Sequence, residues 1–140
     1  MILYLDSSSL VKLFFAEAGS IEVCTLVSSA SAVATSLVSL PEAAAGLARL
    51  GRERVLDAEG VAARLSALHQ QWQGFVAIDV NETRAGELAV KHGLRGFDSV
   101  HLAAALDLRE AAGPGADVRF SSFDRRLNAA ATAEGLVILQ

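Results

Sequence analysis

The stretch Ile2-Leu3-Tyr4-Leu5-Asp6-Ser7-Ser8 indicates how this chain begins to fold. Four apolar or aromatic residues without polar alternation are typical of a strand buried on both faces, as in a parallel sheet. Asp6 stands where that strand should end, and ligands of open α/β sheets bind beyond the carboxyl ends of the strands. Asp6 is also a residue type that caps helices. Because Ser7 or Ser8 can supply that cap, Asp6 is left as a candidate site residue.

The composition predicts a single globular domain over residues 1–140. Hydrophobic residues make up 52% of the chain and charged residues 20%, which excludes disorder. Cys24 is the only cysteine, so no disulfide can form within one chain, as suits a reducing compartment. No apolar run approaches the ~18 residues of a membrane span, and no basic residue precedes the first apolar stretch. We therefore expect no membrane segment and no signal peptide, and a cytoplasmic protein.

Strand and helix patterns alternate along the whole chain. Strands are expected at 2–5, 32–36, 75–80, 118–121 and 136–139. Helices are expected at 7–15, 20–27, 39–50, 57–72, 82–92, 98–106 and 125–134. This alternation predicts an α/β fold, a three-layer sandwich around a central parallel five-stranded sheet.

Two details of this prediction concern how individual helices start and which face they bury. Ser20 and Ser39 are expected to cap the second and third helices, with Pro41 in the first turn of the third. The buried face of the second helix is expected to carry Ile21, Cys24, Leu26 and Val27. Cys24 is then most simply a small core residue.

Four carboxylates follow strands or open helices in this plan: Asp6, Glu42, Asp98 and Asp124. The carboxyl ends of parallel strands and the helix starts that follow them share one edge of the sheet, so these side chains can converge. Asp79, at the end of the third strand, is a weaker candidate. For Glu42 and Asp98 taken singly, a purely structural role at a helix start is an equal alternative.

Clustered carboxylates need a positive partner. Two charges ~4 Å apart at an effective dielectric constant of ~20 repel by ~4 kcal/mol, and a helix dipole offsets only about 0.3–1 kcal/mol. Oxygen-only ligands favour Mg²⁺ or Mn²⁺ over zinc. Such sites support phosphoryl transfer. The net charge of −4 argues against a general nucleic-acid coat, so any nucleic-acid contact needs a local group of bases.

Four motifs then carry a family resemblance. They are Tyr4 to Leu13 (YLDSSSLVKL), Pro41-Glu42 with Arg49, Gly96 to Ala105 (GFDSVHLAAA) and Ser121 to Leu127 (SSFDRRL). In these motifs the chain resembles PIN-domain ribonucleases, and its size and spacing resemble VapC-type toxins of toxin–antitoxin pairs. The resemblance covers essentially the whole chain, and its first and third motifs are the most specific.

The resemblance implies an endoribonuclease that depends on Mg²⁺ or Mn²⁺ and cleaves RNA with a metal-activated water, leaving 5′-phosphate and 3′-hydroxyl ends. Asp6, Glu42, Asp98 and Asp124 match the family's acidic, metal-binding positions. Ser8 matches a hydroxyl that supports the first acid, and Ser122 matches a Ser or Thr two residues before the last one. His101 also matches a frequent family residue; it can orient Asp98, one helical turn away, or simply pack in the core.

The resemblance also implies partners: RNA, a second copy of the chain in a homodimer, and a VapB-like antitoxin. The antitoxin's C-terminal segment would lie in a groove beside the first helices, which assigns contacts to Leu10, Phe14 and Phe15. Candidate RNA contacts, near the acids in sequence, are Lys12, Arg95, Arg125 and Arg126. For each of these bases ordinary solvation is the alternative.

Three other interpretations remain. A metal-dependent phosphatase or phosphotransferase of the haloacid-dehalogenase kind also begins with a strand that ends in Asp, but it needs a second Asp where this chain has Ser8. A receiver domain needs paired acids after the first strand, and Asp6 has no acidic neighbour. A catalytically silent antitoxin-binding module would be favoured by a missing acid, and none of the acids is missing.

Overall fold

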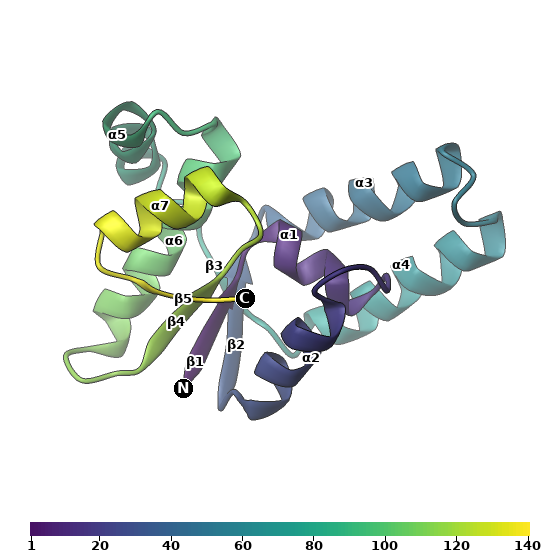
Figure 1. The fold of residues 1–140 in the computed structure, drawn as a ribbon, viewed down its shortest axis with the longest axis horizontal. Coiled ribbons are helices and arrows are strands. Elements are labelled where there is room, and N and C mark those ends of the chain that lie inside the picture. Colours follow the sequence, from purple (N-terminus) through teal and green to yellow (C-terminus); the bar gives the residue numbers. More distant parts are fainter.

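A computed structural model describes residues 1–140 and shows one parallel sheet between two layers of helices (Figure 1). The strands are β1 (Ile2–Leu5), β2 (Ala32–Ser36), β3 (Val76–Ile78), β4 (Val118–Ser121) and β5 (Val137–Leu139). The helices are α1 (Ser7–Leu10), the 3₁₀ turn η1 (Val11–Leu13), α2 (Ser20–Ser29), α3 (Ser39–Arg52), α4 (Ala58–Trp72), α5 (Glu82–His92), α6 (Gly96–Ala112) and α7 (Arg125–Ala133). The predicted three-layer α/β fold is confirmed.

The strand order is β3-β2-β1-β4-β5, and every neighbouring pair is parallel. The first strand of the chain is therefore the central one, with Ile2 opposite Ala32 on one side and Val118 on the other. This position explains the unbroken apolar run of β1, because a central strand of a covered parallel sheet is buried on both faces.

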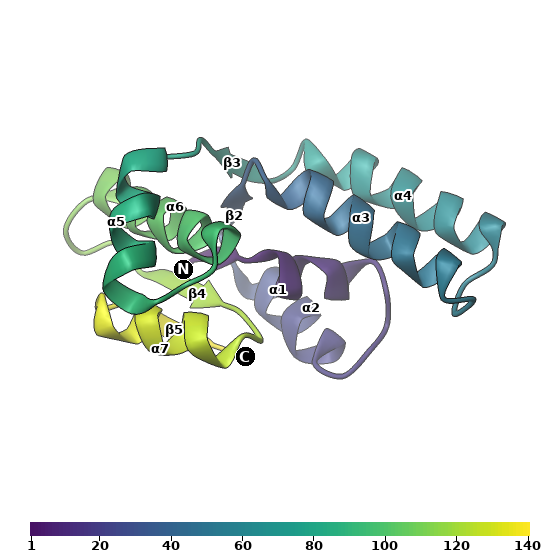
Figure 2. The same ribbon diagram turned by 90° about the horizontal axis from the view of Figure 1, so that it is seen from above.

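Alternate residues of β1 belong to two separate cores. Tyr4 faces α5, α6 and α7, where its ring stacks on Phe120 with 5.5 Å between ring centroids. Leu3 and Leu5 face the other way, into a core with Leu10 of α1 and side chains of α2, α3 and α4. Figure 2 shows these two groups of helices on opposite sides of the strands. Each fully buried Leu contributes about 1.5–3 kcal/mol through its removal from water.

Helices α3 and α4 form a hairpin that extends beyond the sheet (Figure 2). Leu47 of α3 and Leu68 of α4 are fully buried and belong to the core shared with β1. They anchor the hairpin at the end that carries Glu42, in the first turn of α3. None of the helices is long and apolar enough to span a membrane.

The second helix differs from the sequence prediction. Its N-cap is Gly19, with φ of 88°, and not Ser20. The Ser20 hydroxyl donates to the carbonyl of Phe15 at 3.2 Å, so it serves the preceding turn. The predicted buried face is only partly right: Leu26 and Val27 are partly buried against the core, but Ile21 is 80% exposed and Cys24 is exposed, and the fully buried residue is Val23. Apolar residues lie on both faces of this short helix, so their spacing did not identify the buried one.

The third helix also starts differently. Its N-cap is Val38, without a side-chain hydrogen bond. Ser39, the predicted cap, is buried and bonds the hydroxyl of Thr35 at 2.6 Å. Thr35 in turn donates to the carbonyl of Leu5 at 2.7 Å, so these hydroxyls connect β2, β1 and α3. A buried hydroxyl must find a partner, and here the neighbouring strand supplies it.

Several element bounds shift as well. Helix α1 ends at Leu10 and continues as a 3₁₀ turn, where one helix over 7–15 was expected. Helix α6 runs from Gly96 to Ala112 and so begins before Asp98 and ends well after the expected 106. Strand β3 is limited to Val76–Ile78 at the edge of the sheet, where most of its residues are exposed.

Candidate active site

Asp6 lies at the junction of the central strand β1 and helix α1. It is the N-cap of α1, and its Oδ1 accepts a hydrogen bond from the backbone N–H of Ser9 at 2.8 Å. The expectation that Ser7 or Ser8 would cap this helix is wrong, because the Ser8 hydroxyl turns back and donates to Asp6 at 2.7 Å. The carboxylate is nevertheless more than a cap, since it accepts two hydroxyl donors as well.

The second hydroxyl comes from Ser122, 116 residues away in the sequence. Ser122 Oγ donates to Asp6 Oδ2 at 2.6 Å and accepts from the backbone N–H of Asp124 at 3.0 Å. Ser8 Oγ similarly accepts from the N–H of Phe123 at 3.0 Å. The two serines thus connect the carboxylate after β1 with the loop after β4. Ser8, the expected support of the first acid, therefore contacts it directly, and Ser122, which was expected only as the hydroxyl residue before the last acid, contacts it as well.

The Asp6 carboxyl group is 4% exposed, and this burial is the main reason why its pKa is raised above the usual range. The hydrogen bonds from Ser122, Ser8 and Ser9 and the nearby His101 oppose the rise without cancelling it. A carboxylate has about four acceptor sites, and three donors use most of them. An approaching cation would favour the charged form of Asp6.

Glu42 lies in the first turn of α3 and is only partly buried. Its Oε2 accepts hydrogen bonds from the Ser7 hydroxyl and from Nε2 of His101, the latter at 2.8 Å. Burial alone would raise the pKa of Glu42, but the hydrogen bonds from His101 and Ser7 outweigh it, so this pKa is lowered. Glu42 therefore carries its charge more readily than Asp6.

Asp98 and Asp124 share the guanidinium group of Arg95. Arg95 Nε donates to Asp98 at 2.9 Å, and Nη2 donates to Asp124 at 3.3 Å. Asp98 lies in the first turn of α6, and Asp124 caps α7 by accepting from the N–H of Leu127 at 2.9 Å. The Arg95 side chain is 76% exposed, so the cation that neutralises this acid pair lies at the surface.

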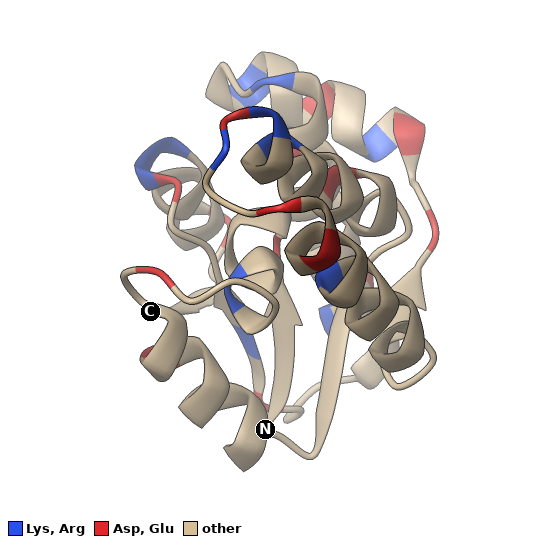
Figure 3. Ribbon diagram, turned by 90° about the vertical axis from the view of Figure 1, so that its right-hand side faces the viewer, with Lys and Arg blue, Asp and Glu red and all other residues tan.

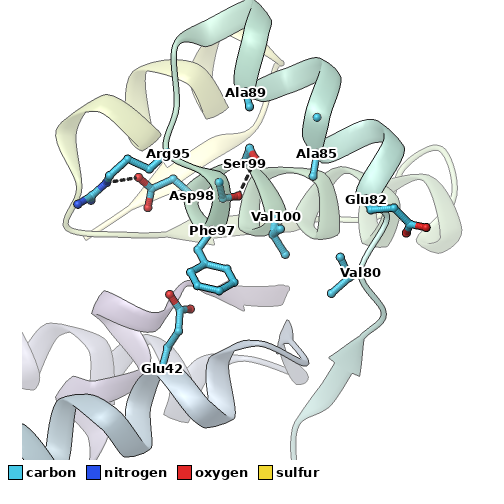
Figure 4. Close-up of a pocket in the computed structure, with 12 residues that line it drawn as sticks. Glu42, Val80, Glu82, Ala85, Ala89, Arg95, Phe97, Asp98, Ser99 and Val100 are labelled. Atoms are coloured by element: carbon cyan, nitrogen blue, oxygen red, sulfur yellow. Dashed lines mark hydrogen bonds and ion pairs between the residues drawn. The ribbon is translucent and has the colours of Figure 1, made fainter.

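Two hollows meet at Glu42 and Phe97; Asp98 lines one of them, and Asp6 and Asp124 line neither. One, of about 660 Å³, lies between α3, α5 and the start of α6 and is lined by Glu42, Arg95, Phe97 and Asp98, among others. Figure 4 shows the Glu42 carboxylate and the Phe97 ring pointing toward one another, with Asp98 turned to Arg95. The other hollow, of about 600 Å³, shares Glu42 and Phe97 and runs along α3 past Arg49 and Arg52.

The donor set fits a hard divalent cation in kind, because all four acids offer carboxylate oxygens. As the side chains stand, however, no three His, Cys, Asp or Glu residues are arranged to hold a metal ion. The acids are engaged separately, by serines at Asp6, by Ser7 and His101 at Glu42, and by Arg95 at the other two. The Arg95 guanidinium acts as a stand-in cation, which a metal would have to displace.

Other predicted contact residues are placed less favourably. Lys12 pairs with Glu17 at 2.8 Å, and its side chain is only 9% exposed, so it is not a free contact for RNA. Leu10 is fully buried and Phe14 is 7% exposed, which leaves Phe15 as the accessible member of that trio. Arg125 and Arg126 are exposed. Asp79 is exposed and lines a different hollow, away from the four acids.

The sequence interpretation missed three residues that line the hollows. Phe97 is 59% exposed and belongs to both. Arg49 and Arg52 line the second hollow. The signal available for Arg49 was its spacing of about two turns from Glu42 on the same helix. Figure 3 shows that charges of both signs gather toward the end of the molecule where the strands terminate.

Comparisons with known proteins show which family the chain resembles. Residues 3–133 match the family model described as "PIN domain". "Ribonuclease VapC45" of Mycobacterium tuberculosis is 35% identical over 141 aligned residues, which cover 96% of this chain and 92% of the relative.

Solved structures share the fold at low identity. PAE2754 of Pyrobaculum aerophilum is 19% identical with a TM-score of 0.71, covering 99% of this chain and 83% of that one. VapC20 of M. tuberculosis, described as a sarcin-ricin loop cleaving toxin, is 20% identical with a TM-score of 0.66, covering 96% of each chain. A chain of a toxin–antitoxin complex from Klebsiella pneumoniae is 16% identical with a TM-score of 0.61, covering 87% of this chain and 86% of that one.

Proposed function

Since this chain belongs to the PIN-domain family, together with the VapC ribonucleases, we propose that it is a metal-dependent endoribonuclease and the toxin of a type II toxin–antitoxin pair. The relative with a ribonuclease name aligns with nearly the whole chain, so the proposal concerns the whole domain and not a fragment of it. The geometry of the acids supports the same reaction class.

The observation that carries the proposal is the environment of Asp6. A helix cap needs one acceptor for one N–H group, and Ser9 satisfies that need. Asp6 accepts two hydroxyl donors in addition, and one of them, Ser122, also binds the N–H of Asp124. Burying a carboxylate is unfavourable for stability alone. The arrangement is favourable if the two acids bind a cation together.

Asp6, Asp98 and Asp124 would hold Mg²⁺ or Mn²⁺, with Glu42 completing the ligand set. A bound ion of this kind supplies Lewis-acid stabilisation of the phosphate charge and lowers the pKa of a water. Ser8 and Ser122 keep Asp6 oriented toward the site. Arg95, once it leaves the two aspartates, is free to contact a phosphate group of the substrate.

The hollow along α3 suggests where RNA would lie. Arg49 and Arg52 line it on one side of Glu42, and the exposed ring of Phe97 stands where both hollows meet. Bases attract the phosphate backbone whatever its sequence, and an exposed aromatic ring can stack on an unpaired base. Arg125 and Arg126, exposed beside Asp124, extend the candidate contact surface.

The proposed protein partner is a VapB-like antitoxin. The solved relative from K. pneumoniae is part of a toxin–antitoxin complex. In this chain Phe15 lines a hollow between η1 and α2, together with Leu13 and the exposed Ile21. Phe14 also lines this hollow, whereas Leu10 is fully buried. That apolar hollow is the proposed contact for an antitoxin segment. A homodimer and a cytoplasmic location complete the proposal.

A phosphatase of the haloacid-dehalogenase kind is not favoured by the site. Such an enzyme needs an acid/base residue two positions after the first Asp. Ser8 occupies that position, and its hydroxyl is used to bind Asp6 itself.

The test is cleavage of total RNA by antitoxin-free protein with Mg²⁺, Mn²⁺ or EDTA, comparing wild type, Asp6→Asn and Asp79→Asn. Asn caps helices as well as Asp does, so the first variant should fold but cleave nothing. Asp79 is an exposed acid after a neighbouring strand, and its variant should cleave normally. Cuts should carry 5′-phosphate and 3′-hydroxyl ends. Equal activity in Asp6→Asn, cleavage that survives EDTA, or cyclic phosphate ends would contradict the proposal.

A further inference from the structure

Two polar rings lie inside the core between β1 and α6. Tyr4 is fully buried in the central strand, and His101 is 2% exposed on a helix face otherwise made of Ala and Leu. Their rings meet edge to face, with 6.1 Å between centroids. Apolar residues of similar size would fill this space without needing hydrogen bonds. The two polar rings therefore call for an explanation beyond packing.

A single chain of hydrogen bonds runs from this core to the candidate active site. The Tyr4 hydroxyl lies 3.0 Å from Nδ1 of His101, and Nε2 of His101 lies 2.8 Å from Oε2 of Glu42. Ser7 joins at the far end, where its hydroxyl donates to the same Oε2. Ser7 Oγ also lies 3.0 Å from Nε2 of His101, so the core pair has one outlet, at Glu42 and Ser7.

The chain also fixes where the His101 hydrogen lies. The Glu42 carboxylate can only accept, so Nε2 must carry the hydrogen that lies between them. In the neutral ring Nδ1 is then an acceptor, and the Tyr4 hydroxyl is the donor that satisfies it. Tyr4 keeps its proton, because burial raises the pKa of this phenol well above its usual value. The Nε2–H group then lies between two acceptors, Glu42 Oε2 and Ser7 Oγ, while the Ser7 hydroxyl hydrogen is donated to the same Oε2.

We propose that Tyr4 and His101 are positioning residues for Glu42: Tyr4 selects the Nε2–H tautomer of His101, and His101 holds Oε2 so that Oε1 faces the hollow as the ligand oxygen. Both protein donors bind Oε2, and Oε1 accepts no hydrogen bond from the protein. Figure 4 shows the carboxylate directed into the hollow, toward Phe97. The catalytic use of Oε1 rests on the proposed function, whereas the tautomer and the orientation do not.

The tautomer is tested first, on the metal-free protein, by imidazole ¹⁵N chemical shifts, which separate protonated from unprotonated ring nitrogens. The chain has three histidines, so assignment is simple. His101 should show a protonated Nε2. His69 is an internal contrast, because its Nδ1 lies 2.7 Å from the Leu65 carbonyl and must carry the hydrogen itself. A protonated Nδ1 in neutral His101 overturns the proposal.

Positioning is tested by Mn²⁺ binding, measured by calorimetry without RNA. Loss of a residue that orients a metal ligand typically weakens binding 10–100-fold, so His101→Leu should bind Mn²⁺ at least about 10-fold more weakly than wild type. His101→Gln, which restores an N–H donor, should recover most of this loss, and Tyr4→Phe should show a smaller one. Thr35→Val, which also removes a buried hydroxyl, should bind as wild type does.

Unfolding curves of the same variants separate positioning from stability. Tyr4→Phe should weaken Mn²⁺ binding in the wild-type background but not in His101→Leu, because the two residues act through one path. Unchanged Mn²⁺ binding in His101→Leu, or no recovery in His101→Gln, overturns the proposal. Because RNA cleavage is not the readout, a wild type that binds Mn²⁺ but cuts no RNA would refute the proposed function and leave the positioning result standing.

Discussion

Removing the Ser122 hydroxyl tests the candidate site through stability alone. Ser122→Ala removes the hydroxyl that donates to the Asp6 carboxylate at 2.6 Å. Both residues are almost fully buried, so water does not readily replace this donor. Hydrogen bonds to charged groups contribute about 1.5–3 kcal/mol each, so the free energy of unfolding near neutral pH should fall by about that amount. For a domain of this size the melting temperature should fall by about 5–10 °C.

The decrease in the free energy of unfolding caused by Ser122→Ala should depend on pH in a defined direction. The pKa of Asp6 is raised above its ordinary value of 3.8, so the folded state holds this proton more tightly than the unfolded state does. Stability therefore falls as pH rises from that ordinary value through the folded pKa. The Ser122 hydrogen bond lowers this pKa. Its removal in Ser122→Ala therefore increases the difference between the pKa of Asp6 in the folded state and that in the unfolded state. The penalty of the variant should be small in acid, grow through this window and then stay constant.

The assay is urea unfolding of wild type and variants at several pH values from the ordinary carboxyl range up to neutral pH. Ser121→Ala is the matched control: Ser121 is equally buried, but its hydroxyl lies 3.0 Å from the neutral hydroxyl of Ser9. It should cost about 0.5–1.5 kcal/mol at every pH. Ser122→Thr keeps the hydroxyl and should remain close to wild type.

Two results would refute this reasoning. Equal penalties in Ser122→Ala and Ser121→Ala at neutral pH would mean that the Asp6 charge does not strengthen the bond. A penalty of Ser122→Ala that increases on acidification would mean that the hydrogen bond favours the protonated form of Asp6.

Further predictions concern other parts of the chain. Gly19→Ala should destabilise the fold by more than about 1 kcal/mol in thermal unfolding, because φ is +88° and the added Cβ would lie 2.5 Å from the ring of Phe123. Gly86 lies in an open position within α5, so Gly86→Ala should instead stabilise the fold by about 0.5–1 kcal/mol. Hydrogen bonds from Lys91 and His92 lower the pKa of Glu134. The free energy of unfolding of Glu134→Gln should therefore be about 0.2–1 kcal/mol below that of wild type at pH values above the ordinary carboxyl pKa, and equal to it at lower pH. Urea unfolding at one pH on each side measures this difference. Arg95→Gln should bind Mn²⁺ more tightly in calorimetry, since the competing guanidinium is gone; weaker binding would show that Arg95 helps the site to hold the metal.

The central strand and the edge that carries the acids could be predicted from the sequence. The run from Ile2 to Leu5 has no polar alternation, and only a strand covered on both faces tolerates that. The parallel order then brings the strand ends to one edge, which is why Asp6 and Asp124 lie in one hydrogen-bond network. These predictions rest on periodicity and topology, which a sequence records directly.

The partners of individual polar side chains could not be predicted. Ser20 and Ser39 look like helix caps, but tertiary contacts use their hydroxyls elsewhere. His101 was expected to orient Asp98 or to pack; its partner is Glu42, 59 residues away in the sequence. Arg95, three residues before Asp98, gave no sign that it would also reach Asp124. Local propensity fixes which groups need a partner, and only the packed structure decides which partner they find.

The double role of Asp6 has an evolutionary consequence. The residue both starts α1 and supplies a carboxylate to the candidate site. Asn preserves the first role and removes the second, and a single base change converts an Asp codon into an Asn codon. If the reaction depends on this carboxylate, selection against the activity can produce a folded, inactive protein through one mutation. Such a descendant would keep its apolar hollow between η1 and α2, and, if that hollow is the antitoxin contact proposed above, it would bind an antitoxin without cutting RNA.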